Sequence, residues 1–362
     1  MKQQYRAQKQ EIVDNYLKRH PDMQRATLAK KIAEDKGDLW SSSKNPVDAI
    51  RSMIRYREGA TGTRLRETRG LKKKGYQEAL KDAEVYWEAK KREELDRINE
   101  RGGAKIFIFD IETLPLTGFI WRLWKQNLSL DHLMQDEWAM VTWAGKWLFE
   151  DDVLGDCLTE EEARNKDDKR IIQSLGAIVD EADVIVAHFG DKFDIPLING
   201  RRLAHRLPPM SPFQSVDTWK ISKRNFNFPS HKLDYLHKHI LGGEGKIKVS
   251  LDLWKRCFEG DAEAIQEMLE YNIQDIRVLE DVYLALRPWD RTHPNMGLYI
   301  EDDVRACCKC GNTELEYLDK PYVTPTGLYD TYRCKSEICG ALSRSRRRSN
   351  IDNRFLNINL AR

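Results

Sequence analysis

The chain has 362 residues, a formal net charge of +2 and 33% charged residues, which is long enough for two or three domains. No apolar run approaches the roughly 18–20 residues that a membrane-spanning helix needs, and the N-terminus has no apolar signal-peptide core. We therefore expect a soluble, cytoplasmic protein with no membrane partner.

The small net charge hides an asymmetry along the chain. Residues 1–75 hold nineteen Lys and Arg against nine Asp and Glu, and residues 341–362 hold six Arg against one Asp. The ends therefore carry about +10 and +5, which leaves the middle at about −13. Basic ends around an acidic centre are typical of a nucleic-acid-binding enzyme whose centre holds metal ions, but charge that serves solubility alone gives the same pattern.

The first 60 residues are predicted to form a helical module. Helix-like patterns cover residues 4–20 and 25–37, and a third, arginine-containing helix is expected after Asn45-Pro46. Three short helices with a basic third member are typical of a helix-turn-helix-like DNA-binding module and also of any small helical bundle. Residues 61–103 follow as a basic, glycine-containing linker and a charged helix.

From Lys105 onward the pattern changes to strands and helices. The runs IFIFDIET and ADVIVAHF are nearly continuous in apolar residues, as buried strands are. MVTWAGKWLF is expected to give two strands joined through Ala144-Gly145, and residues 159–182 are expected to form one helix that opens on Thr159. This order predicts an α/β domain over residues 104–290.

Two pairs of residues in this domain are spaced for a shared site. Asp110 and Glu112 lie two apart at the end of the first strand, so both side chains leave the same face. A buried carboxylate pair is costly unless cations neutralise it, which favours a metal site over a charged pair at a surface strand end. Tyr271 and Asp275 are four apart on a predicted helix and therefore face the same way.

The stretch AHFGDKFDIP adds two acidic candidates, Asp191 and Asp194. Asp194 precedes a helix whose early Pro196 suits a first turn, which would point its carboxylate back toward the strand ends. We favour Asp194 as the metal ligand and Asp191 as a loop residue near the substrate path.

These motifs resemble, in type and order, the DEDD superfamily of 3′–5′ exonucleases. They are Asp-x-Glu in FDIET, Phe-Asp in DKFDIP and Tyr-x-x-x-Asp in YNIQD, and they match the subclass with tyrosine in the last motif. The segments VDTWKISKRNFNF, SHKLDYL and RPWDRTHPN look most like stand-alone bacteriophage exonucleases related to the proofreading domain of family-B DNA polymerases. The resemblance covers residues 104–290 and implies an RNase H-like fold, a mixed five-stranded sheet flanked by helices.

The resemblance implies a metal-dependent enzyme that hydrolyses phosphodiester bonds from DNA 3′ ends in phage replication, recombination or repair. Tyr271 would orient the attacking water. The implied ligands of two Mg²⁺ or Mn²⁺ ions are Asp110, Glu112, Asp194 and Asp275. The implied partners are DNA, as single strands or 3′ ends, and a DNA polymerase acting in trans.

Two other classes of function stay open. One is an RNase H-like endonuclease of the transposon type, and the other is a DNA-binding protein with an inactive nuclease core. The chain also departs from the family at Phe189, where many relatives carry Asn that helps to hold the substrate strand or the loop. How this chain holds a 3′ end is therefore undecided from the sequence.

Five of the seven cysteines cluster near the C-terminus. Two pairs, one spaced C-x-x-C and one C-x₄-C, are separated by 23 residues, and a glycine that permits a tight knuckle follows each pair. We predict a zinc ribbon over residues 291–345 with one structural Zn²⁺, although a cluster without metal is the alternative. The predicted ligands are Cys307, Cys310, Cys334 and Cys339.

Further nucleic-acid contacts are expected outside these motifs. Trp121 could stack on a base and Lys232 could contact a phosphate, but core packing and surface solvation are the alternatives. Arg344, Arg346 and Arg347 lie in or beside a basic tail over residues 346–362, and we expect them to contact phosphates.

Overall fold

The chain divides into two compact units, Met1–Tyr86 and Trp87–Arg362, and each is described by itself. In the parts of the chain that the structure describes, no helix is long and apolar enough to cross a membrane. The structure is a computed structural model, and the residues it describes are 2–20, 23–40, 45–57, 85–121, 124, 129–135, 137–243, 249–300, 304–325 and 327–345.

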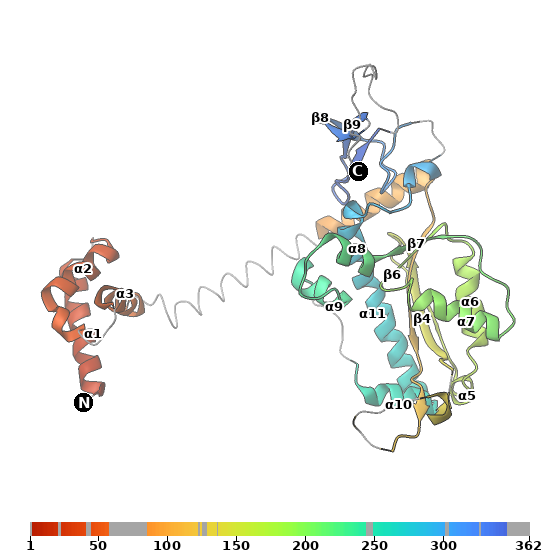
Figure 1. Cartoon of the computed structure of the whole chain (residues 1–362), viewed down its shortest axis with the longest axis horizontal. Helices are drawn as coiled ribbons and strands as arrows, with labels where there is room; N and C mark the ends of the chain where they lie inside the picture. The colour runs from red at the N-terminus through yellow and green to blue at the C-terminus, as the bar shows by residue number, and fades with distance from the viewer. Residues whose placement is uncertain are drawn as a thin grey trace. The chain divides into compact units, whose positions relative to one another are not determined.

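The smaller unit is helical, as predicted. Its elements are α1 (Lys2–Arg19), α2 (Arg25–Lys36), the 3₁₀ turn η1 (Gly37–Trp40) and α3 (Pro46–Arg57) (Figure 1). Proline suits the first position of α3 because that position has no hydrogen-bond partner for an N–H group. The three helices close around an apolar core made of Val13, Leu28, Ala29, Ile32, Trp40, Ile50 and Ile54.

The larger unit is built on a mixed five-stranded sheet. Its central strand β1 (Ile106–Thr113) pairs antiparallel with β4 (Met140–Trp147) and parallel with β6 (Val184–Ala187). The outer strands are β5 (Leu154–Cys157) beside β4 and β7 (Gln214–Asp217) beside β6, which gives the order β5-β4-β1-β6-β7. This sheet, flanked by helices, is the RNase H-like α/β architecture that was predicted.

Helices cover both faces of the sheet. Figure 1 shows α6 (Lys169–Val179) and α7 (Asp194–Ala204) on one side and α8 (Thr218–Asn225), α9 (Leu233–Tyr235) and α11 (Ala262–Leu286) on the other. Further helical elements are α5 (Glu160–Asn165), η3 (Leu236–Leu241), α10 (Leu251–Glu259), η4 (Arg287–Trp289) and η5 (Met296–Tyr299).

Alternation along β1 decides which face its acidic residues share. Phe107 and Phe109 enter the core cluster that holds α6 and the first part of α11, whereas Ile106 and Ile108 enter the cluster that holds the later part of α11. Because side chains alternate along a strand, Asp110 lies on the face that the later part of α11 covers.

Two local predictions were wrong. Residues 140–147 form one strand, because Ala144 and Gly145 stay paired with β1 and β5 instead of making a turn. The helix predicted over residues 159–182 is two helices, since Lys166 takes a left-handed backbone conformation (φ 58°) and ends α5. The expected opening at Thr159 is confirmed by its hydrogen bond from the Glu162 N–H.

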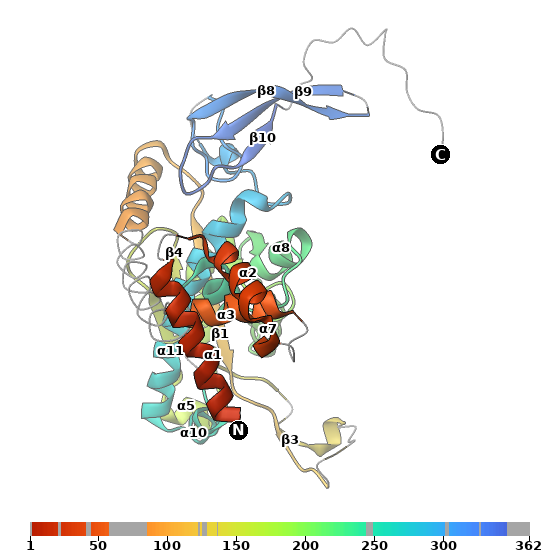
Figure 2. The same cartoon turned by 90° about the vertical axis from the view of Figure 1, so that its left-hand side faces the viewer.

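The cysteine-rich part carries its own antiparallel sheet in the order β10-β9-β8, drawn at the top of Figure 2. The strands are β8 (Leu315–Thr324), β9 (Gly327–Cys334) and β10 (Leu342–Arg344). A separate two-stranded arm joins β2 (Thr117–Gly118) to β3 (Leu133–Gln135), with the turn η2 (Leu130–His132) before β3.

The helix through residues 85–101 contacts both α11, beside the five-stranded sheet, and the cysteine-rich part. Lys91 Nζ lies 3.0 Å from Asp281 Oδ1 on α11. Further along the same helix, Arg97 Nη2 donates to the Cys310 carbonyl at 3.1 Å, and Arg101 Nη1 donates to Thr313 Oγ1 at 2.7 Å.

Candidate active site and thiol cluster

Three of the four predicted carboxylates converge between β1 and α11. One carboxylate oxygen from each of Asp110, Glu112 and Asp275 lies within 4.8 Å of the others. Asp275 is 1% exposed, and the two strand residues are partly buried. Carboxylates this close and this shielded repel one another, and a bound cation would relieve that repulsion.

A buried asparagine, Asn272, fixes α11 against the strands that carry this group. Its Nδ2 donates to the Asp110 carbonyl at 3.3 Å and to Thr142 Oγ1 on β4 at 3.1 Å. The position of Asp275, one turn later on α11, therefore depends on Asn272. Asn272, which is fully buried, was not among the residues predicted from the sequence; the available signal was an amide beside an apolar residue in the motif YNIQD.

Asp194 begins α7 and is 2% exposed. Burial raises its carboxyl pKa well above the usual value, and the negative charge of Asp110 raises it further, against opposing backbone hydrogen bonds from its own N–H and that of Ile111. Asp194 thus lies near Asp110, although it is outside the trio defined by the 4.8 Å separation.

The residues present fit hard divalent cations. Asp194 Oδ1 is buried, and among the residues described here no hydrogen-bond donor reaches it. All of the candidate ligands are carboxylates, and oxygen ligands favour Mg²⁺ or Mn²⁺ over softer metals. The identity of the ion and the assignment of individual ligands stay predictions.

Tyr271 lies one turn before Asp275 on α11 and is partly buried against the core on the α6 side of the sheet. Its predicted role toward water stays a prediction. Asp191 is held in its loop by the Ser215 hydroxyl and by Lys220, whose Nζ lies 2.5 Å from Asp191 Oδ2. His188 is hydrogen-bonded through Nδ1 to Thr218 Oγ1 at 2.9 Å.

Asp217, which the sequence analysis also missed, joins the loop before α7 to the start of α8. Its Oδ1 accepts from the backbone N–H groups of Phe189 at 3.0 Å, Trp219 at 3.0 Å and Lys220 at 3.2 Å. Burial raises the pKa of Asp217, and its charge adds to the effects that raise the pKa of Asp194.

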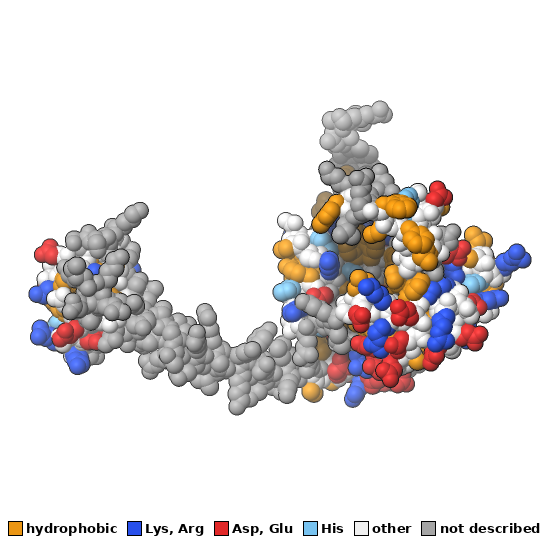
Figure 3. Space-filling view, turned by 90° about the horizontal axis from the view of Figure 1, so that it is seen from below, with side chains coloured by type: hydrophobic (Ala, Val, Ile, Leu, Met, Phe, Trp, Pro, Cys, Tyr) orange, Lys and Arg blue, Asp and Glu red, His pale blue; other side chains and the backbone are white. Residues whose placement is uncertain are grey.

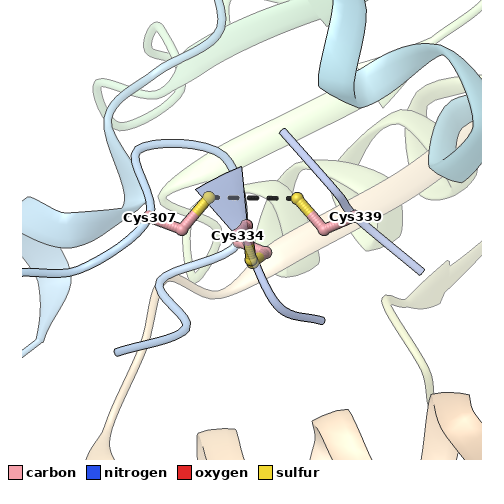
Figure 4. Close-up of side chains that lie close together, drawn as sticks. Cys307, Cys334 and Cys339 are labelled. Carbon is pink, nitrogen blue, oxygen red and sulfur yellow. Dashed lines mark hydrogen bonds between the residues drawn. The ribbon is translucent and has the colours of Figure 1, made fainter. Parts of the chain in front are cut away.

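The four predicted cysteines come together in one cluster. Figure 4 shows three of them, Cys307, Cys334 and Cys339. The Sγ atoms of Cys307 and Cys339 are 3.9 Å apart and those of Cys310 and Cys334 are 3.6 Å apart. A tetrahedral zinc site with Zn–S bonds of about 2.3 Å requires sulfur separations of about 3.8 Å, whereas a disulfide requires about 2.05 Å. The cluster therefore fits one structural Zn²⁺, and its metal stays a proposal.

Two glycines shape the knuckles as predicted. Gly311 and Gly340 have φ values of 75° and 60°, which glycine adopts without steric cost. Cys308 stands outside the four-sulfur group, and burial raises the pKa of its thiol. Arg287 is fully buried, and the thiolate charges of Cys339 and Cys310 add to the effects that raise its pKa.

The predicted nucleic-acid contacts lie mostly on the surface. Trp121 is 89% exposed on the β2–β3 arm, which rules out core packing, and Lys232 is also exposed. Arg344 is exposed with its guanidinium carbon 4.0 Å from the ring centroid of Tyr329. Arg346 and Arg347 lie outside the described residues. On the face drawn in Figure 3, exposed hydrophobic side chains of the larger unit gather around a hollow.

Comparison with known families agrees with this architecture. A family model described as RNase_H superfamily matches residues 133–287. The larger unit contains an RNase H-like domain. The match covers less than half of the chain and starts after β1, so it includes Asp194, Tyr271 and Asp275 but neither carboxylate of β1.

Among solved structures, the chain is similar to the family B DNA polymerase from the hyperthermophilic archaeon Pyrobaculum calidifontis. The identity is 16% and the TM-score is 0.37, over 51% of this chain and 26% of the polymerase. The chain thus spans about a quarter of the polymerase. A search of the curated proteins found no match.

Proposed function

We propose that the protein is a metal-dependent 3′–5′ exonuclease that hydrolyses DNA. The observation that carries the proposal is the convergence of Asp110, Glu112 and Asp275, with buried Asp194 beside them, in an RNase H-like domain. The tyrosine one turn before Asp275 supports the exonuclease subclass that the sequence motifs resemble.

The metal ions and the protein side chains would have separate roles in hydrolysis. Bound Mg²⁺ or Mn²⁺ ions would supply an activated water and charge stabilisation for the leaving 3′ oxygen. The four carboxylates would hold these ions, Asn272 would keep α11 in register with β1, and Tyr271 would orient the attacking water by its hydroxyl.

Further parts of the chain would bind the nucleic acid or stabilise the enzyme. Exposed Trp121, Lys232 and Arg344 would contact bases or phosphates, and the N-terminal helices would form a helix-turn-helix-like DNA-binding module. The four cysteines would hold one structural Zn²⁺. If the enzyme proofreads, a separate DNA polymerase would be its partner, in phage replication or in recombination and repair.

The test uses purified full-length protein with single-stranded DNA labelled at the 3′ end or internally, with Mg²⁺ and then with EDTA. We expect mononucleotides released from the 3′ end, and no cleavage in EDTA. Internal cuts would instead identify an endonuclease, and binding without cleavage would identify an inactive DNA-binding protein. RNA of the same sequence tests the preference for DNA.

The matched variants are Asp275→Asn and Asp191→Asn. Asp275→Asn should abolish cleavage but keep DNA binding, because it removes one ligand charge at nearly unchanged volume. Asp191→Asn changes a carboxylate outside the trio and should keep most activity. Near wild-type turnover of Asp275→Asn would overturn the site assignment.

A further inference from the structure

The loop between β6 and α7 holds an exposed phenylalanine in an unfavourable backbone conformation. Phe189 has φ 72°, in the left-handed region that bulky residues rarely adopt. Phe149 has the same φ, but its ring is 5% exposed and packs in the core, which offsets the strain. Phe189 is 36% exposed, so core packing does not explain its conformation.

The Phe189 ring is paired with Trp219 at the start of α8. The two ring centroids are 5.0 Å apart with an interplanar angle of 78°. One buried carboxylate, that of Asp217, accepts the backbone N–H of both residues at 3.0 Å. The Phe189 carbonyl also accepts the backbone N–H of Phe193 at 3.1 Å, and Phe193 directly precedes Asp194, so the aromatic pair adjoins the carboxylate site.

Two exposed lysines lie beside the rings. Lys192 Nζ is 5.9 Å from the centroids of both rings, and Lys223 Nζ is 4.7 Å from that of Trp219. Neither forms an ion pair with any other residue that the structure describes. Aromatic faces with adjacent cations are complementary to a single nucleic-acid strand, whose bases stack and whose phosphates are negative.

We propose that the Phe189–Trp219 pair is a stacking site for a nucleobase of the strand whose 3′ end enters the carboxylate site. Lys192 and Lys223 contact the phosphates on either side of that base. The identity of this strand rests on the proposed function, and Phe189, Trp219 and the two lysines are the residues that bind it.

The test is Phe189→Gly, measured by binding of the protein to fluorescently labelled single-stranded DNA in EDTA. Glycine adopts the left-handed conformation without steric cost, so the variant should fold with a Tm close to that of the wild type. We expect binding roughly tenfold weaker, as for the loss of one stacked base. Trp219→Leu should weaken binding similarly, and Trp219→Phe should restore most of it.

Abasic strands separate stacking from a structural role. An oligonucleotide with one abasic site, moved stepwise from the 3′ end, should bind the wild type weakly at one position. At that position Phe189→Gly should show no further loss, because the partner base is already absent. Equal losses in both proteins at every position would overturn the proposal, as would wild-type affinity of Phe189→Gly for the unmodified strand.

Trp289→Leu is the matched control. Trp289 forms a comparable edge-to-face pair with Phe226, at 5.4 Å and 69°, and is 60% exposed. Its variant should bind DNA like the wild type. Because binding is measured without metal, failure of cleavage would count against the proposed exonuclease function and leave the stacking result standing.

Discussion

At the scale of single residues, Asp194 carries a buried carboxyl group whose ionisation costs stability. Its raised pKa means that the metal-free folded protein favours the protonated carboxyl. The stability gained from keeping the Asp194 carboxyl protonated is fully present below the pKa of this group in the unfolded chain. It is lost as pH rises through the pKa of the group in the folded protein. Cation binding would reverse the loss by neutralising the charge.

We therefore predict that Asp194→Asn stabilises the metal-free protein by ~1–3 kcal/mol at pH 8 but abolishes cleavage. The gain should shrink toward pH 4, where the wild-type carboxyl is protonated. Thermal unfolding in EDTA at both pH values measures the effect. A loss of stability of equal size at both pH values would show that the carboxylate is satisfied without a cation.

The buried amide of Asn272, in contrast to the Asp194 carboxylate, both stabilises the fold and positions Asp275. Asn272→Ala should cost ~1–3 kcal/mol in urea unfolding, since it leaves buried partners unsatisfied. It should also lower kcat by displacing Asp275. The control is Asn225→Ala, which removes one hydrogen bond, 2.9 Å long, to Ile221 on α8 and should leave kcat unchanged. Equal kcat values for the two variants would contradict the positioning role.

At the scale of elements, strands that are uniformly apolar were predicted correctly from the sequence. The predictions were wrong where packing between residues distant in the sequence determines the local conformation. Apolar runs located β1 and β6, and carboxylate spacing placed Asp110 and Glu112 on one face. Gly145 was predicted to join two strands, but it lies within β4, where the absence of a side chain allows β1 to pack closely against it. Neither the left-handed Lys166 nor the hydrogen bond from the Phe189 N–H to Asp217 could be predicted, because Lys is rarely left-handed and Phe189 and Asp217 are distant in sequence.

The packing role of Gly145 gives a prediction about β4. A Cβ there would lie 2.8 Å from the backbone oxygen of Ile108, so Gly145→Ala should destabilise by ~1–3 kcal/mol. Gly200 on α7 is the matched control, because a Cβ there meets nothing within 4 Å. Gly200→Ala should stabilise by ~0.5–1 kcal/mol. Urea unfolding measures the free energy of unfolding of both variants. A Gly145→Ala protein as stable as the wild type would contradict the close approach of the two strands.

At the scale of the whole molecule, the thiol cluster is joined to the part of the larger unit that carries the carboxylate trio. Arg287 follows α11 directly and lies buried near the thiolates, and the helix through residues 85–101 bonds to both parts. Two Arg287 nitrogens, Nε and Nη2, find no hydrogen-bond acceptor among the described residues. A metal thiolate centre would supply negative charge beside this cation.

Loss of the proposed zinc should therefore lower the stability of the whole larger unit. We predict that Cys310→Ser loses the metal and lowers Tm by several degrees, while Mg²⁺-dependent cleavage of short substrates partly survives at low temperature. Metal analysis and calorimetry measure the two effects. Cys308→Ser, outside the four-sulfur group, should retain zinc and Tm, and an equal loss in both variants would contradict the ligand assignment.

The contact between Asn272 and Asp110 joins positions 162 residues apart in the chain. During synthesis, the ribosome therefore releases β1 long before it releases α11. A nascent chain that stops short of α11 has the two carboxylates of β1 but no Asp275 to complete the trio. The proposed nuclease would consequently stay harmless to nucleic acids around the ribosome until most of its chain has been translated.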